Sequence, residues 1–133
     1  MITGGAIQIL LYKQFKKASI IVLDESYSQV SPWFLKSILY VLKRCEQVFM
    51  HLKDIDCDDY SFYLLAINKI VHQLCFWNRT ESHCVGVAII DINKAFTHAI
   101  NFYINKGNEV IFIEPQSGEI VKISPRSVLK MII

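Results

Sequence analysis

The spacing of apolar residues along this chain changes from a helical period to an alternating one. Between residues 33 and 52, apolar side chains recur every three or four positions, which predicts an amphipathic helix of roughly five turns. Ser31 and Pro32 precede it and supply a hydroxyl N-cap and a proline at the first helical position. Residues 62–76 are almost wholly apolar and predict a second, largely buried helix, whose first turn contains Cys57.

Short runs with a period of two predict strands elsewhere. A β-branched run at 18–24 predicts a buried strand, and the alternation after residue 83 predicts strands at 84–92, 97–104, 109–114, 119–124 and 128–133. Residues 105–107 (Asn-Lys-Gly) predict a three-residue hairpin loop in which Gly107 is left-handed. Helices followed by a mostly antiparallel sheet indicate the α+β class.

Length and composition limit the classes of function. With 133 residues, 53% apolar side chains and no linker, the chain is expected to form one domain, 1–133, and not to be disordered. A net charge of +2 gives no electrostatic footprint for nucleic acid, and no apolar run is long enough for a membrane span. Because no signal peptide is recognised at the N-terminus, a cytoplasmic location with four free thiols is expected.

The spacing of histidines and cysteines does not favour a metal site. No C-x-x-C pair occurs, and the nearest cluster is His72 and Cys75 followed by His83 and Cys84. Adjacent side chains diverge in both helix and strand, which is poor geometry for zinc. Cys45 and Cys75 are interpreted as small apolar core residues on helix faces.

Cys57 and His98 are the best candidates for chemistry. The first turn of a helix favours a thiolate, whereas the neighbouring aspartates raise the pKa of a thiol, so the sign of the net effect is left open. Counting outward from the predicted loop places Ile104 opposite Asn108 and His98 opposite Glu114, on one face of the sheet. A carboxylate in that position orients an imidazole and stabilises its protonated form.

Each of these features also has a purely structural interpretation. A cysteine at a helix start is commonly structural, and a cross-strand His–Glu pair is commonly a surface ion pair. His51, His72 and His83 are interpreted as surface residues or as hydrogen-bonded residues of helices and loops.

Four ordered motifs carry a resemblance to a known family: residues 56–61 (Asp-Cys-Asp-Asp-Tyr-Ser), 85–87 (Val-Gly-Val), 98–101 (His-Ala-Ile-Asn) and 113–118 (Ile-Glu-Pro-Gln-Ser-Gly). Together they resemble small bacterial and phage proteins related to the C-terminal domain of a fungal galactose-binding agglutinin. That domain is a papain-like cysteine protease with a triad in the order Cys, His, Glu. The similarity covers residues 18–133 and leaves 1–17 as an N-terminal extension.

The resemblance implies roles for particular residues. Cys57 would be the nucleophile, His98 the general base and acid, and Glu114 the orienting carboxylate, with Asn101 and Gln116 in supporting hydrogen bonds. The family's protease is calcium-activated, which makes Asp58 and its neighbours candidate calcium ligands, although no cofactor is required by the sequence itself. Ile100 replaces the family's tryptophan, and the lectin half of the agglutinin has no counterpart in this chain.

The resulting hypothesis is a papain-like α+β domain, with a helical half and a sheet half, that hydrolyses peptide or protein substrates through a thioester. One alternative is a catalytically silent papain-like binding module, such as a phage or bacterial accessory protein. Another is an acyltransferase in which an amine resolves the thioester. Fold and triad alone do not separate these functions.

Overall fold

The computed structural model describes residues 1–49, 56–76, 81–94 and 96–133. The helices are α1 (Gly4–Gln14), α2 (Pro32–Phe49), α3 (Cys57–Cys75) and the short 3-10 helix η1 (Pro125–Ser127). The strands are β1 (Ile2–Thr3), β2 (Ser19–Ile21), β3 (Ser26–Ser28), β4 (Ser82–His83), β5 (Val85–Asp91), β6 (Thr97–Ile104), β7 (Val110–Ile113), β8 (Ile120–Val121) and β9 (Val128–Ile132). The predicted α+β class is confirmed.

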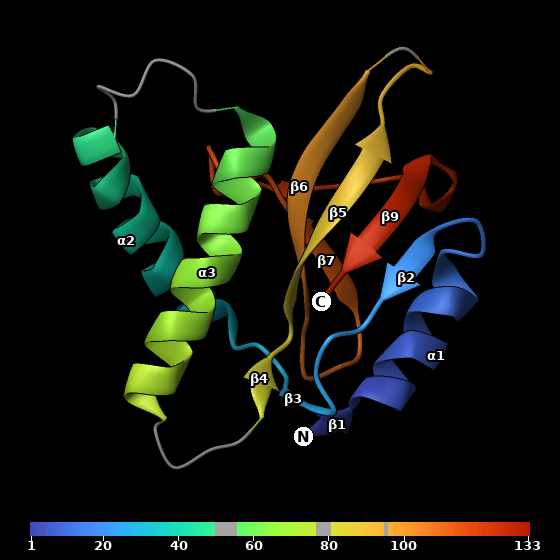
Figure 1. Cartoon of the computed structure of the whole chain (residues 1–133), viewed down its shortest axis with the longest axis horizontal. Coiled ribbons are helices and arrows are strands. Elements are labelled where there is room, and N and C mark those ends of the chain that lie inside the picture. The colour runs from blue at the N-terminus through green and yellow to red at the C-terminus, as the bar shows by residue number, and fades with distance from the viewer. Residues whose placement is uncertain (50–55, 77–80, 95) are drawn as a thin grey trace.

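The strands form one large sheet and one small sheet. The large sheet has the order β2-β9-β5-β6-β7-β8, antiparallel except for the parallel pair β2 and β9. The small sheet has the order β1-β3-β4. In Figure 1, α2 and α3 lie side by side next to the large sheet, and α1 lies on its other side near β2.

The residues before α3 explain where this helix begins. The Asp56 side chain accepts a hydrogen bond from the Asp59 backbone, and the Asp59 carboxylate accepts one from the Asp56 backbone, which is a reciprocal capping box. Acidic residues in the first turn also suit the positive end of the helix dipole. The sequence prediction that the first turn contains Cys57 is therefore confirmed.

Two hydrophobic clusters hold the elements together. The larger cluster lies on the large sheet and includes Ile7 and Leu11 of α1, so residues 1–17 contribute to the main core. The smaller cluster joins α2 to α3 through Ile38, Leu42 and Leu64, which are at most 4% exposed. Complete burial of such side chains stabilises the fold by about 1.5–3 kcal/mol each.

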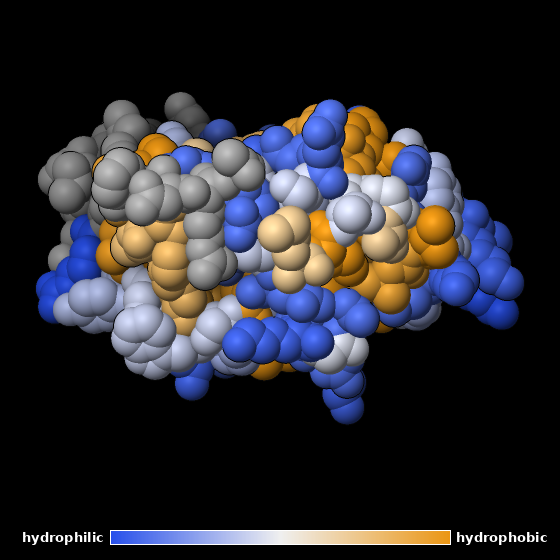
Figure 2. Space-filling view, turned by 90° about the horizontal axis from the view of Figure 1, so that it is seen from below, coloured by the Kyte–Doolittle hydropathy of each residue, from blue (hydrophilic) through white to orange (hydrophobic). Residues whose placement is uncertain are grey.

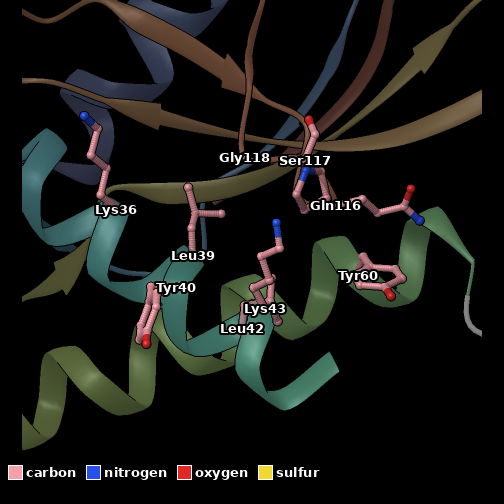
Figure 3. Close-up of a pocket in the computed structure, with 10 residues that line it drawn as sticks. Lys36, Leu39, Tyr40, Leu42, Lys43, Tyr60, Gln116, Ser117 and Gly118 are labelled. Carbon is pink, nitrogen blue, oxygen red and sulfur yellow. The ribbon is translucent and has the colours of Figure 1, made fainter. Parts of the chain in front are cut away.

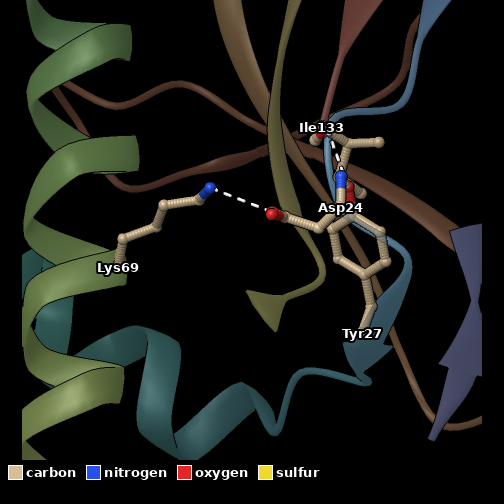
Figure 4. A network of polar contacts seen from close by, with 4 residues as sticks. All are labelled: Asp24, Tyr27, Lys69 and Ile133. Carbon is tan, nitrogen blue, oxygen red and sulfur yellow. Dashed lines mark hydrogen bonds and ion pairs between the residues drawn. The ribbon is translucent and has the colours of Figure 1, made fainter. Parts of the chain in front are cut away.

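Polar contacts fasten the loop between β2 and β3 to its surroundings (Figure 4). The Lys69 ammonium of α3 lies 3.0 Å from the Asp24 carboxylate. Burial raises the pKa of Asp24, but hydrogen bonds from Ser82 and Lys69 outweigh it and leave this pKa below its ordinary value. The buried Tyr27 hydroxyl accepts from the Asp24 amide and donates to the Ile133 carbonyl.

Two details of the β6–β7 hairpin differ from the prediction. Ile104 pairs with Val110 rather than with Asn108, so the loop is longer than three residues. The left-handed residue is Asn108, with φ of 61°, and not Gly107. Asparagine adopts this conformation more readily than most residues, and the Asn108 side chain accepts a hydrogen bond from Gln29 Nε2 over 2.6 Å. Within the loop, the Asn105 side chain accepts from the Gly107 and Glu109 amides.

Candidate functional site

The structure brings His98 and Glu114 together. His98 Nε2 lies 2.7 Å from Glu114 Oε2, and each side chain is about a quarter exposed, at 25% and 23%. The predicted register was wrong by two residues, which keeps every side chain on its own face of the sheet. The two residues therefore meet as diagonal neighbours instead of facing each other directly.

Glu114 also shapes the turn that follows β7. Its backbone amide donates to the Glu119 carbonyl over 2.9 Å, and its carbonyl accepts from the Gly118 amide over 2.7 Å. Gly118 has φ of 75°, a conformation that residues with a Cβ rarely adopt. The His98–Glu114 pair thus fixes the base of a tight turn formed by residues 115–118.

Cys57 does not lie on the sheet but is the first residue of α3, where it is half-buried. Among the described residues, no hydrogen bond links its thiol to His98 or Glu114. A hydrogen bond between neighbouring carboxyl groups lowers the pKa of Asp56 and raises that of Asp58. The structure therefore forms one contact of the predicted triad, and the catalytic roles of Cys57, His98 and Glu114 stay a prediction.

Asn101 connects the helical part of this region to the sheet. Its side chain is 1% exposed, and Nδ2 donates to the Ser61 carbonyl over 2.9 Å and to the Gly86 carbonyl over 3.1 Å. Ser61 belongs to α3, and Gly86 belongs to β5. One amide group therefore holds the first half of α3 against the centre of the sheet.

A pocket of about 270 Å³ lies between α2, the start of α3 and the 115–118 turn (Figure 3). We call it the loop pocket. It is lined by Lys36, Leu39, Tyr40, Leu42 and Lys43 of α2, Tyr60 of α3, and Pro115, Gln116, Ser117 and Gly118 of the turn. Figure 3 shows the Lys43 side chain extending from α2 toward Gln116 and Ser117.

The lining of the loop pocket suits a polar, negatively charged ligand. Among the described residues, the lining contains two lysines and no aspartate or glutamate. The Ser117 hydroxyl and the Gln116 amide add neutral hydrogen-bonding groups. Five of these residues lie in the motifs at 56–61 and 113–118, but the resemblance gives a role only to Gln116. The lysines were not predicted, because lysines on an amphipathic helix are usual for a solvated face.

The remaining histidines and cysteines differ in part from their predicted settings. His72 and His83 are 3% and 5% exposed, so their interpretation as surface residues is wrong and that as hydrogen-bonded residues holds. Cys75 is exposed, not in the core, whereas Cys84 is buried ahead of β5 as expected. His51 and the Cys45 side chain lie outside what the structure describes.

The described residues offer no group of three or more histidine, cysteine, aspartate or glutamate side chains that could hold a metal ion. Calcium binding near Asp58 therefore stays a prediction from the resemblance. None of the described helices is long and apolar enough to cross a membrane.

Among known proteins, only solved structures are similar to this chain, and the similarity is one of fold. Searches of protein families and of curated proteins find no match. The match to the structure of PSL1a in complex with E64 covers 99% of this chain and 50% of the PSL1a chain, with a TM-score of 0.80 and 18% sequence identity. The match to the Polyporus squamosus lectin bound to the epitope Neu5Aca2-6Galb1-4GlcNAc covers 99% of this chain and 49% of the lectin chain, with a TM-score of 0.78 and 17% sequence identity.

These neighbours correct the functional hypothesis. The fold is that of part of a fungal lectin, which agrees with the predicted relationship to an agglutinin and leaves a papain-like protease unshown. The comparisons contradict the prediction of a cysteine hydrolase or protease, because the solved neighbours with this fold are lectins. This chain spans about half the length of each neighbour.

Proposed function

We propose that this chain is a ligand-binding module without turnover, and that the loop pocket accepts a ligand that carries a carboxylate. The observation that carries this proposal is the pairing of Lys36 and Lys43 with a wall of neutral hydrogen-bonding groups in one cavity. Lysine is a compact cation on a flexible stem and adapts to carboxylates of different geometry. The fold likeness to a lectin supports a binding role.

The ligand chemistry follows from the walls of the pocket. A carboxylate lies next to the lysine ammonium groups, and hydroxyl or amide groups of the ligand bond to Gln116 and Ser117. Tyr60 and Leu39 supply apolar contact on the helical side. The sialic acid in the epitope named for the lectin neighbour is a carboxylated sugar of this kind, and an acidic peptide presents the same charged group.

In this proposal the His98–Glu114 contact positions the turn and does not react. Glu114 is bonded to His98 on one side and through its backbone to the turn on the other, so the pair holds Gln116 and Ser117 at the rim of the pocket. We retain as part of the proposal the papain-like arrangement that the resemblance implies, in which a groove separates a helical half from a sheet half. The loop pocket lies at such a junction.

Titration calorimetry tests the ligand class. The sialylated trisaccharide Neu5Acα2-6Galβ1-4GlcNAc, its neutral counterpart Galβ1-4GlcNAc and an acidic pentapeptide are compared. We expect the carboxylated ligands to bind more tightly than the neutral sugar, by up to about fivefold, because an exposed ion pair contributes about 0.2–1 kcal/mol. Whichever carboxylated ligand binds better identifies the source of the group.

Variants of the two pocket lysines locate the binding site. Lys36→Gln combined with Lys43→Gln should remove the preference for carboxylates, whereas Lys13→Gln on α1 serves as a matched helical control and should keep it. Equal affinity for neutral and charged ligands, or no effect of the double variant, would contradict the proposal. So would peptide cleavage, monitored by mass spectrometry, that disappears in Cys57→Ala.

A further inference from the structure

A second cavity, of about 200 Å³, lies at the opposite end of the two long helices from the 115–118 turn. It is bounded by the first turn of α2, the last turn of α3 and the strands β3 and β4. We call it the aromatic pocket. Figure 2 looks onto this end of the molecule and shows hydrophobic atoms interrupted by hydrophilic ones, rather than one continuous apolar face.

Four packed rings form the walls of the aromatic pocket. The Phe34 ring meets His83 edge to face, with centroids 4.8 Å apart and an interplanar angle of 84°. His72 stacks on His83 at 4.7 Å and 17°, and Phe76 lies 5.1 Å from His72. Ring faces carry partial negative charge, so they attract the weakly positive C–H groups of a ring laid against them.

His83 presents a hydrogen-bond acceptor inside this cavity. Its Nδ1 lies 2.8 Å from the buried Asn68 Oδ1, which accepts the ring proton. Burial, with a smaller contribution from the neighbouring His72, lowers the pKa of His83 to about 3, so the ring is neutral at physiological pH. Nε2 then carries a lone pair, and the part of the chain that the structure describes gives it no hydrogen-bond donor.

Other lining groups are uncharged hydrogen-bonding side chains. Ser28 bonds to His72 Nε2 over 3.0 Å, and Gln29 and Ser31 add an amide and a hydroxyl. Trp33, which is 75% exposed, stands at the mouth. Among the described residues, no aspartate, glutamate, lysine or arginine lines this cavity, so none of these side chains compensates a charged ligand.

We propose that the aromatic pocket is a second binding site, for an uncharged six-membered ring that carries a hydroxyl group on its edge. The ring lies between Trp33 and the Phe34–Phe76 wall, and its hydroxyl donates to His83 Nε2. Both a pyranose sugar and the phenol of a tyrosine side chain have this chemistry. The site is independent of the loop pocket, since the two cavities share no lining residue.

Nuclear magnetic resonance titration tests this site with two probes, methyl β-galactopyranoside and p-cresol. We expect at least one of them to shift the amide signals of residues 28–34 and 81–84 and to leave those of residues 115–118 unchanged. Cyclohexane-1-carboxylate, a ring of similar size with a charge, should bind more weakly than either probe. The better probe identifies the source of the ring.

Three variants make the assignment falsifiable. Trp33→Ala removes an exposed ring without touching the core and should weaken binding about two- to tenfold. His83→Phe keeps a ring but removes the acceptor and should weaken it by about tenfold. Tyr12→Ala removes a half-exposed ring on α1 and should have no effect. Binding of neither probe, or an unchanged affinity in Trp33→Ala, would overturn the proposal even if His83→Phe fails to fold.

Discussion

At the scale of single residues, burial changes the pKa of ionisable side chains in the interior, and His83 is the clearest case. His83 is 5% exposed, and its pKa is lowered to about 3, chiefly by loss of hydration. Its ordinary value is about 6.5. Between these two values the unfolded chain binds a proton at this site and the folded chain does not.

The free energy of unfolding should therefore fall as the pH drops from about 6.5 toward 3 and should level off below that, with respect to His83. In His83→Phe this part of the pH dependence should disappear, so the variant, less stable at pH 7.5, approaches the natural protein at pH 4. Urea unfolding at a series of pH values measures the difference. Parallel curves for the two proteins would show that His83 does not carry the effect.

The cysteines provide a second test of burial. Burial raises the pKa of Cys84 to about 12, whereas Cys75 is exposed and Cys57 is half-buried. Because the thiolate is the nucleophile, limiting iodoacetamide at pH 7.5 should label Cys75 and Cys57 in the folded protein and leave Cys84 unmodified. Peptide mass spectrometry gives the order of labelling.

Labelling of Cys57 well before Cys75, in spite of its lower exposure, would indicate that the helix start activates this thiol, as the nucleophile role implied by the resemblance requires. Equal or slower labelling of Cys57 agrees with a module that binds without turnover. Modification of Cys84 in folded protein would contradict its burial.

At the scale of elements, the periodicity of apolar residues predicted both long helices and the strands that form the centre of the sheet. Pro32 begins α2, and β6 spans Thr97–Ile104, as expected. The α1 helix was missed because its apolar residues do not gather on one face strongly enough to stand out from the sequence. Its Ile7 and Leu11 become buried only through contact with distant strands.

The contact between His98 and Glu114 could be predicted from the sequence, but the pocket around the 115–118 turn could not. The prediction that His98 and Glu114 meet was correct in spite of a two-residue error in register, because a shift of two leaves each side chain on the same face of the sheet. The long-range arrangement of α2 against the 115–118 turn is not encoded in any local pattern, so the loop pocket could not be anticipated. The His72–His83 stack was missed for the same reason, since it joins a helix end to a separate short strand.

At the scale of the whole molecule, Tyr27 links segments that are far apart in the sequence. Its hydroxyl is within 2.9 Å of the Ile133 carbonyl and 2.8 Å of the Asp24 amide, inside the main core. Tyr27→Phe keeps the ring and removes both bonds, which leaves the Asp24 amide without this acceptor. We expect a loss of about 1–3 kcal/mol in the free energy of unfolding.

Thermal and urea unfolding measure this loss, and Tyr12→Phe on the exposed side of α1 is the matched control, for which no more than a few tenths of a kcal/mol is expected. A neutral effect of Tyr27→Phe would mean that water replaces the hydroxyl and that the link between the two segments is not a stabilising one.

The parallel pairing of β2 with β9 has a consequence for how the protein is made. Ser19 pairs with Lys130, so these partners are separated by more than a hundred residues. During translation β2 leaves the ribosome long before β9 is synthesised, and its apolar Ile20 has no strand beside it in the meantime. The nascent chain therefore passes through a stage in which β2 has been made but its partner strand has not, and apolar surface exposed in this way is what chaperones recognise.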